Sequence, residues 1–216
     1  MDSSSEKFAL KVPLPLKCSQ CSEPASIKIH LDMTSFEWTC SKCGFEHPSF
    51  LGVDFTIGFL LLLRSYDELL TERDFSMTIV MAAMAFDAEL SRLFGKWKQI
   101  DAGEIDREDC EKELRDFRTI NRKIEEVSKL LVGKGIDEFV DGCPELRERI
   151  SKDFPSLRIG FLAEDFAQHL FWPRNKILHW GDAKHSYKEA VRCYSLADMG
   201  LHILRVMDKE RRKCLA

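Results

Sequence analysis

The sequence has little that would take the chain to or across a membrane. Its first residues, Met1 to Glu6, are polar and lack the basic-then-apolar pattern of a secretory signal. The longest apolar run, Phe55 to Leu63, ends at Arg64 and is too short to span a bilayer. Internal repeats and low-complexity segments are also absent from the sequence. We therefore predict a cytoplasmic protein without a membrane segment.

A strong positive charge is also lacking. The 216 residues include 32 Lys and Arg against 36 Asp and Glu, a net charge of −4, which argues against a protein that coats nucleic acid with its whole surface. The charge is uneven, because residues 174–216 hold 10 basic and 5 acidic residues whereas residues 51–173 hold 17 and 25. A basic C-terminal segment suits a phosphate ligand. A solvated basic helix explains the same charge equally well.

The composition is that of a folded globular protein. Hydrophobic residues make up 44% of the chain and charged residues 31%, which excludes a disordered chain. A length of 216 residues is sufficient for one core together with a small additional module.

Four of the eight cysteines form two C-x-x-C pairs with 18 residues between them: Cys18, Cys21, Cys40 and Cys43. Two thiolate pairs at this separation are typical of a tetrahedral zinc site. Disulfides are the alternative, and the missing secretory signal disfavours them. We predict a structural Zn²⁺ ion bound by all four thiolates, which leaves no open coordination position for catalysis.

The segment around these cysteines has the pattern of a small β module. Residues 26–31 and 35–39 alternate between polar and apolar side chains, and residues 32–34 between them are expected to form a turn. Gly44 follows the second pair, where the thiolates require a tight backbone. Residues 1–50 are therefore predicted to form a zinc ribbon. Its role stays open between nucleic-acid binding, docking of a partner and capping of the domain that follows.

From Asp54 onward the apolar residues recur about every 3.6 positions, which predicts helices. The expected helices cover residues 54–70, 75–93, 106–131, 143–153, 159–170, a segment after Pro173, and 186–209. The predicted fold class is mainly α, an up-and-down helical bundle over residues 51–216 with the small N-terminal β zinc ribbon before it.

The most informative motif is the hexapeptide Arg174-Asn175-Lys176-Ile177-Leu178-His179. On a helix, Asn175 and His179 are four residues apart and share one face, and the long Arg174 side chain reaches the same region. Pro173 suits the first position of a helix. The three polar groups are therefore expected near a helix N-terminus, which favours an anion such as a phosphodiester. The alternative is a capped helix with an exposed arginine and a half-buried histidine.

These residues resemble the R-N-x-x-x-H motif of the HEPN family, small helical domains that include many metal-independent ribonucleases. The flanks agree, because Phe171-Trp172 precedes the motif and Trp180-Gly181 follows it. The resemblance covers residues 54–209 and implies a HEPN-like bundle in which residues 133–160 are an insertion. It also implies a homodimer that brings two copies of His179 into one cleft, and an antitoxin or nucleotidyltransferase partner.

The function implied by the resemblance is a metal-independent endoribonuclease, in the setting of a toxin or phage-defence effector. The ribose 2′-hydroxyl attacks the neighbouring phosphate, His179 transfers protons, Arg174 binds the phosphate through paired hydrogen bonds, and Asn175 orients the phosphate or the imidazole. His185 is a local candidate for a second proton-transfer group. Glu89 is a candidate for a supporting acidic residue, with Asp87 or a plain surface carboxylate as the alternative.

A function of a different class fits the same residues. The zinc ribbon and the helical bundle would then form a non-catalytic module that binds a protein or nucleic-acid partner. The tryptophans that flank the motif, Trp172 and Trp180, fit core packing better than base stacking.

Overall fold

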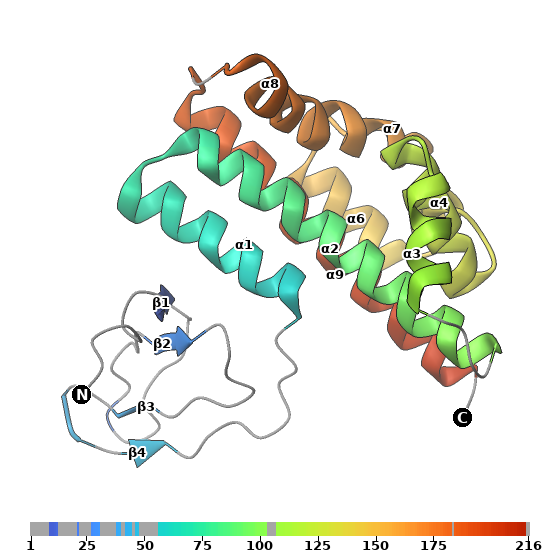
Figure 1. Cartoon of the computed structure of the whole chain (residues 1–216), viewed down its shortest axis with the longest axis horizontal. Helices are drawn as coiled ribbons and strands as arrows, with labels where there is room; N and C mark the ends of the chain where they lie inside the picture. The colour runs from blue at the N-terminus through green and yellow to red at the C-terminus, as the bar shows by residue number, and fades with distance from the viewer. Residues whose placement is uncertain are drawn as a thin grey trace.

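The computed structural model describes most of the chain from Thr56 onward and short stretches before it (Figure 1). The described residues are 9–12, 21, 27–30, 38–39, 42–44, 46–47, 56–102, 107–182 and 184–214. Within these ranges the chain is mainly helical and compatible with a helical bundle, which confirms the predicted fold class at this level.

The described N-terminal residues include four short strands: β1 (Ala9–Val12), β2 (Ile27–His30), β3 (Trp38–Thr39) and β4 (Glu46–His47). β1 pairs antiparallel with β2, and β3 pairs antiparallel with β4. Both sequence stretches with polar–apolar alternation therefore contain a strand. In the described pairing, however, β2 and β3 do not pair with each other: β2 pairs with β1, and β3 pairs with β4. Alternation indicates a strand but does not determine its partner. The expected turn at residues 32–34 lies outside the described residues.

The helical part begins with α1 (Ile57–Asp67), a π-helical turn η2 (Glu68–Glu72) and α2 (Phe75–Ala102). Thr56 caps α1, since its Oγ1 accepts a hydrogen bond from the Phe59 N–H at 3.2 Å. Asp74 caps α2 in the same way, through the Met77 N–H at 2.9 Å. Arg73 lies between them at φ 56°, where the chain reverses. The start of the second helix after Asp74 is confirmed.

Four helices follow: α3 (Arg107–Asp116), α4 (Ile120–Val132), α5 (Ile136–Asp141) and α6 (Pro144–Asp153). The expectation of one helix over residues 106–131 is wrong, because the chain breaks between α3 and α4. Thr119 caps α4 through the Arg122 N–H at 3.3 Å, and Phe117 packs edge-on against Phe94 with ring centroids 5.5 Å apart. The helix cap at Thr119 and the contact between Phe117 and Phe94 thus lie at a break between two helices, although the apolar periodicity of the sequence continues through it. The stretch expected as an insertion, residues 133–160, holds α5 and α6.

The last helices are α7 (Leu162–Phe166), the π-helical turn η3 (Ala167–Phe171), α8 (Trp172–Trp180) and α9 (Tyr187–Lys213). α9 begins at a capping box, in which Ser186 Oγ accepts from the Glu189 N–H and the Glu189 carboxylate accepts from the Ser186 N–H. The predicted helix over residues 186–209 is therefore confirmed and extends to Lys213.

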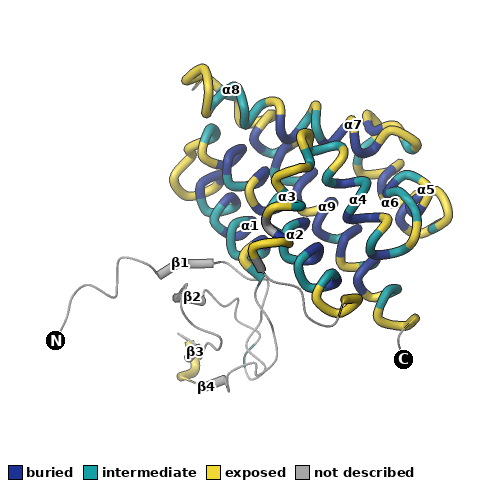
Figure 2. The backbone as a smooth tube through the Cα atoms, turned by 45° about the vertical axis from the view of Figure 1, so that its right-hand side comes forward, coloured by how far each residue is buried: buried dark blue, intermediate teal, exposed yellow. Residues whose placement is uncertain are grey.

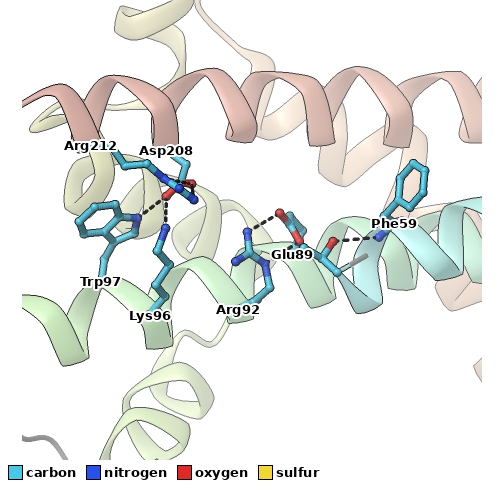
Figure 3. Close-up of polar contacts among 8 residues, drawn as sticks. Phe59, Glu89, Arg92, Lys96, Trp97, Asp208 and Arg212 are labelled. Carbon is cyan, nitrogen blue, oxygen red and sulfur yellow. Dashed lines mark hydrogen bonds and ion pairs between the residues drawn. The ribbon is translucent and has the colours of Figure 1, made fainter. Parts of the chain in front are cut away.

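The two longest helices, α2 and α9, run parallel and side by side (Figure 1). Phe75 and Tyr187 meet at their N-terminal ends, with ring centroids 5.7 Å apart. At their C-terminal ends, Trp97 Nε1 donates to Asp208 Oδ1 at 2.6 Å (Figure 3). α1 packs on both helices, and the chain between α2 and α9 covers the other side.

One apolar core joins these helices. Phe86 is fully buried and packs against Phe166 and Phe171, with ring centroids 4.9 and 6.2 Å apart, which ties α2 to α7 and η3. The core also includes Ile136, Val140, Leu146 and Ile150 from α5 and α6. In the part of the chain that the structure describes, every helix is too short or too polar to cross a bilayer.

Candidate functional site

The hexapeptide lies on α8, but not at a helix N-terminus. α7, η3 and α8 follow one another without a break, and Phe171, just before α8, has helical backbone angles. The three motif residues therefore lie inside a continuous helical run, where the backbone N–H groups are already used. The expectation that the motif lies at a helix N-terminus is wrong, so free backbone N–H groups offer no anion site there.

A π-helical turn, η3, directly precedes α8, whose second residue is Pro173. Proline has no N–H, so the carbonyl of His169, four residues earlier, cannot receive its usual helical hydrogen bond. One residue before the proline, the Trp172 N–H bonds to the Ala167 carbonyl, five residues earlier rather than the usual four, which is the π-helical pattern. The Cys193 thiol on α9 donates to the His169 carbonyl, at an S···O distance of 3.3 Å. Burial raises the pKa of Cys193 to about 12, so the thiol keeps its proton for this contact.

Arg174 and Asn175 line a cleft of about 660 Å³ between α8, α2 and the α3–α4 junction. Arg174 Nη1 donates to Asn175 Oδ1 at 2.9 Å, which fixes the guanidinium against the amide. The other residues that line the cleft are Asp87, Leu114, Arg115, Phe117, Arg118, Thr119, Ile120, Asn121, Lys123, Ala167, Phe171 and Trp172.

The charged lining of this cleft is mostly cationic. Its cations are Arg115, Arg118, Lys123 and Arg174, and Asp87 is the one carboxylate among the described lining residues. Lys123 Nζ contacts Asp87 Oδ1 at 2.5 Å and also donates to Ser91 Oγ, so this pair holds α4 against α2. Cations thus outnumber carboxylates among the described lining residues, which favours an anionic ligand.

His179 does not line this cleft. It lies in the last turn of α8 with an exposed side chain, and Gly181 ends the helix at φ 66°. The structure therefore brings Arg174 and Asn175 together and leaves His179 one turn further along, at the open end of the helix. Figure 2 shows α8 as an outer element coloured mainly as intermediate and exposed.

The flanking tryptophans are on the surface. Trp172 is 50% exposed and Trp180 is 66% exposed, so the expectation that they pack in the core is wrong. Their rings meet edge to face, with centroids 5.4 Å apart and an interplanar angle of 87°. Apolar character led to the core prediction, but α8 contributes no buried residue to the bundle.

The second-helix acid has a structural role. Glu89 is 1% exposed, and its carboxylate accepts two hydrogen bonds from Arg92, from Nε at 3.0 Å and Nη2 at 2.7 Å (Figure 3). It does not line the cleft, whereas Asp87, the alternative acid, does. The local histidine His185 bonds instead to the Asp182 carbonyl at 3.1 Å, at the turn before α9.

Another histidine, His169, lies just before the motif. Burial, with the nearby Arg192, lowers its pKa below the ordinary value, so its imidazole is mainly neutral near pH 7. His169 therefore adds no charge to this end of the molecule.

A second cleft of about 520 Å³ lies between α6 and α9. Its charged lining is mixed, with Arg149, Lys188 and Arg192 against Asp153 and Asp198, and it holds none of the motif residues. The mixed charge gives it less preference for an anion than the cleft beside α8.

The contribution of α3 and α4 to the cleft was not predicted from the sequence. Arg115, Arg118 and Lys123 lie 51 to 59 residues before Arg174, and no spacing rule links them to the motif. The available signal was the density of cations from residue 115 to residue 123, a stretch that also includes Arg122.

Two of the four predicted zinc ligands, Cys21 and Cys43, are described, whereas Cys18 and Cys40 lie outside the described residues. Cys43 is exposed and lies in a turn, followed by Gly44 at φ 69°. This left-handed glycine is the tight backbone expected after a cysteine pair. The zinc site itself stays a prediction.

Comparison with known proteins adds no assignment. No protein-family model, no curated protein and no solved structure matches the chain. A functional assignment therefore depends on the residues that line the cleft beside α8.

Proposed function

We propose that the chain is a metal-independent endoribonuclease of HEPN type, in which Arg174, Asn175 and His179 act on a phosphodiester. The observation that carries the proposal is the charge of the cleft beside α8, where the described lining has four cations and one carboxylate. Arg174 and Asn175 of the motif are part of that lining. An RNA backbone is a ligand whose charge complements such a cleft.

The reaction uses a nucleophile that RNA itself provides. A base takes the proton from a ribose 2′-hydroxyl, and the oxygen attacks the adjacent phosphorus. The bond to the 5′ oxygen of the next nucleotide breaks, and an acid protonates that oxygen. The products are a 2′,3′-cyclic phosphate and a 5′-hydroxyl, so neither a metal ion nor an external co-reactant is consumed.

Each motif residue has a distinct role in this reaction. Arg174 binds the phosphate oxygens, because a guanidinium has five N–H groups and only one is used on Asn175 in the described contacts. Asn175 holds the guanidinium in place through its Oδ1. His179 transfers protons. Its exposed position at the end of α8 gives the substrate access to the imidazole.

The reaction needs a second proton-transfer group, and we propose that a second copy of the chain supplies it. A homodimer that places the two motifs at one cleft would bring two copies of His179 to one phosphodiester. Within this proposal the protein is a toxin or phage-defence effector, and an antitoxin or nucleotidyltransferase is its partner.

One observation favours a second candidate function. His179 lies outside the cleft that Arg174 and Asn175 line, so the same cations would serve an RNA-binding module that lacks catalysis. Such a module would bind RNA with the same dependence on Arg174 and leave the strand intact.

The test is incubation of the purified wild-type protein with total RNA and tRNA in the presence of EDTA, with the cleavage ends mapped. The proposal expects cleavage with 2′,3′-cyclic phosphate ends, and its loss in Arg174→Ala and His179→Ala. Arg147→Ala is the matched control, because Arg147 is an exposed arginine on α6 outside the cleft.

The outcomes separate the two functions. Cleavage that persists in His179→Ala sinks the ribonuclease assignment of this residue. RNA binding that depends on Arg174, without cleavage by the wild type under any of these conditions, supports the non-catalytic module instead. Circular dichroism of each variant shows whether a loss of activity comes from unfolding.

We also propose that Cys18, Cys21, Cys40 and Cys43 bind one structural Zn²⁺ ion. The donor set supports this, because four thiolates fill a tetrahedral site and leave none of its positions open. The left-handed backbone at Gly44 is compatible with the second cysteine pair. The zinc therefore has no part in the cleavage chemistry.

A further inference from the structure

The outer face of α8 bears two tryptophans with a lysine between them. Trp172, Lys176 and Trp180 follow at intervals of four residues, which places them along one side of the helix. The Lys176 Nζ lies 5.8 Å from the centroid of the Trp172 ring, and the two indoles meet edge to face with centroids 5.4 Å apart. We call these three residues the α8 platform.

The exposure of the α8 platform has no structural explanation within the described chain. Tryptophan is a residue that folded proteins bury on average, yet the two here are 50% and 66% exposed. α8 contributes no buried residue, so neither indole supports the core. The edge-to-face contact leaves indole surface open to solvent on a short helix.

The α8 platform is continuous with the cationic cleft. Trp172 belongs to both, because it lines the cleft together with Arg174 and Asn175. A ligand that crosses this part of the molecule meets guanidinium groups first and indole faces next. Cations beside aromatic faces complement a chain of phosphates and bases, since the phosphates pair with the cations and the bases stack.

From this continuity we propose that the α8 platform is a stacking site for an unpaired nucleobase, which makes single-stranded RNA the substrate class. The inference rests on the proposed function, because it concerns the same cleft. In duplex RNA the base faces are covered by their neighbours and the side chains reach mainly backbone and 2′-hydroxyl groups. An indole can therefore stack only on a base from a loop, a bulge or a single strand.

The test measures binding of a labelled single-stranded RNA of about 10 nucleotides to the full chain. The RNA carries 2′-O-methyl groups, which remove the nucleophile, so binding is measured apart from cleavage. Trp180→Ala and Trp172→Ala are each expected to weaken binding by about 5- to 150-fold, the range found for loss of one base–aromatic contact. Trp180→Phe is expected to recover much of the affinity because it restores an aromatic face.

The matched control is Leu178→Ala. Leu178 lies on the same helix and is also 50% exposed, but it has no aromatic face. It is expected to change the affinity by less than about twofold, and a duplex of the same sequence is expected to bind at least about tenfold more weakly than the single strand.

Three results would overturn the inference: unchanged affinity in both tryptophan variants, equal affinity for the duplex, or a change of oligomeric state in the RNA-free tryptophan variants. The last result would assign the platform to a contact between copies of the chain. Failure of the proposed function would give a different result. Unmethylated RNA would then remain intact, while binding of the methylated strand would still depend on the tryptophans.

Discussion

At the scale of single residues, Asp208 joins α9 to α2 through hydrogen bonds from Lys96 and Trp97. The residue is 7% exposed, and its carboxylate accepts hydrogen bonds from Lys96 Nζ, Trp97 Nε1 and the Arg212 guanidinium, at distances of 2.6 to 3.0 Å (Figure 3). A buried carboxylate with this many donors is well compensated, whereas removal of its charge weakens the acceptor for the buried Trp97 indole and for the partly exposed Lys96 and Arg212 side chains.

Asp208→Asn is therefore expected to lower the free energy of unfolding by about 1–3 kcal/mol. The matched control is Asp101→Asn, which breaks the pair between Asp101 and Arg211 across the same two helices, at 2.7 and 2.9 Å. That pair is partly solvated, so its loss is expected to cost less than about 1 kcal/mol. Urea denaturation of both variants at pH 7 measures the difference, and equal costs would show that burial of Asp208 does not matter.

The contribution of Asp208 also depends on pH. Burial alone would raise its pKa, but the hydrogen bonds from Lys96, Arg212 and Trp97 outweigh burial and hold the pKa below its usual value. A lowered folded-state pKa means that the stabilisation is present above the unfolded-state pKa of about 3.9 and is lost as the pH falls through the folded-state pKa. The stability difference between wild type and Asp208→Asn should therefore stay nearly constant from pH 7 to about 4 and shrink as the pH falls further. A difference that grew with acidification would contradict this assignment.

At the scale of elements, two glycines set how closely the helices approach. A Cβ atom on Gly58 would lie 2.7 Å from the Ala85 carbonyl oxygen on α2, and one on Gly200 would lie 2.8 Å from the Phe86 ring. Gly95 of α2 offers the matched control, since a Cβ atom there would have no described neighbour within 4 Å outside its own helix backbone.

Gly58→Ala and Gly200→Ala are expected to lower the free energy of unfolding by about 1–3 kcal/mol, although alanine favours a helix. Gly95→Ala is expected to raise it by up to about 1 kcal/mol, because only the helix propensity changes. Thermal denaturation of the three variants measures both signs. A stabilising effect at Gly58 or Gly200 would show that these helices can separate at little cost.

The elements show which sequence signals suffice for prediction. The start of α2 after Asp74 and the start of α9 at Ser186 follow from local caps beside a strong periodicity, and both are confirmed. The break before Thr119 and the continuity of the chain through Pro173 were not foreseen. At the break, Phe117 packs against Phe94 of α2. At Pro173, which has no N–H to donate to the His169 carbonyl, the Cys193 thiol of α9 donates to this carbonyl instead. Both causes lie far away in the sequence.

The same distinction holds for the candidate site. Arg174 and Asn175 are adjacent in the sequence, and their place in one cleft follows from the helix. Arg115, Arg118 and Lys123 join them only because α4 packs against α2 and α8 lies over the α3–α4 junction. Packing between helices that are distant in the sequence produces no periodic pattern of residues, so the cationic cleft could be identified only from the structure.

At the scale of the whole molecule, the helical part has an extensive core of its own. The described members of this core run from Leu62 to Met207. The four proposed zinc ligands, in contrast, all lie before residue 50. The stability of the helical part is therefore expected to be independent of the metal.

This independence predicts a specific result for loss of the metal. The double variant Cys18→Ser with Cys40→Ser removes one thiolate from each pair, so the zinc content measured by mass spectrometry should fall from about one ion per chain to near zero. The helical signal in circular dichroism and the main thermal transition should remain, because the core from Leu62 to Met207 is unchanged. Cys110→Ser is the control, a buried cysteine of α3 outside the proposed set, and should keep the zinc. If the helical signal collapsed together with the zinc content, the metal would be stabilising the helical core as well as its own module.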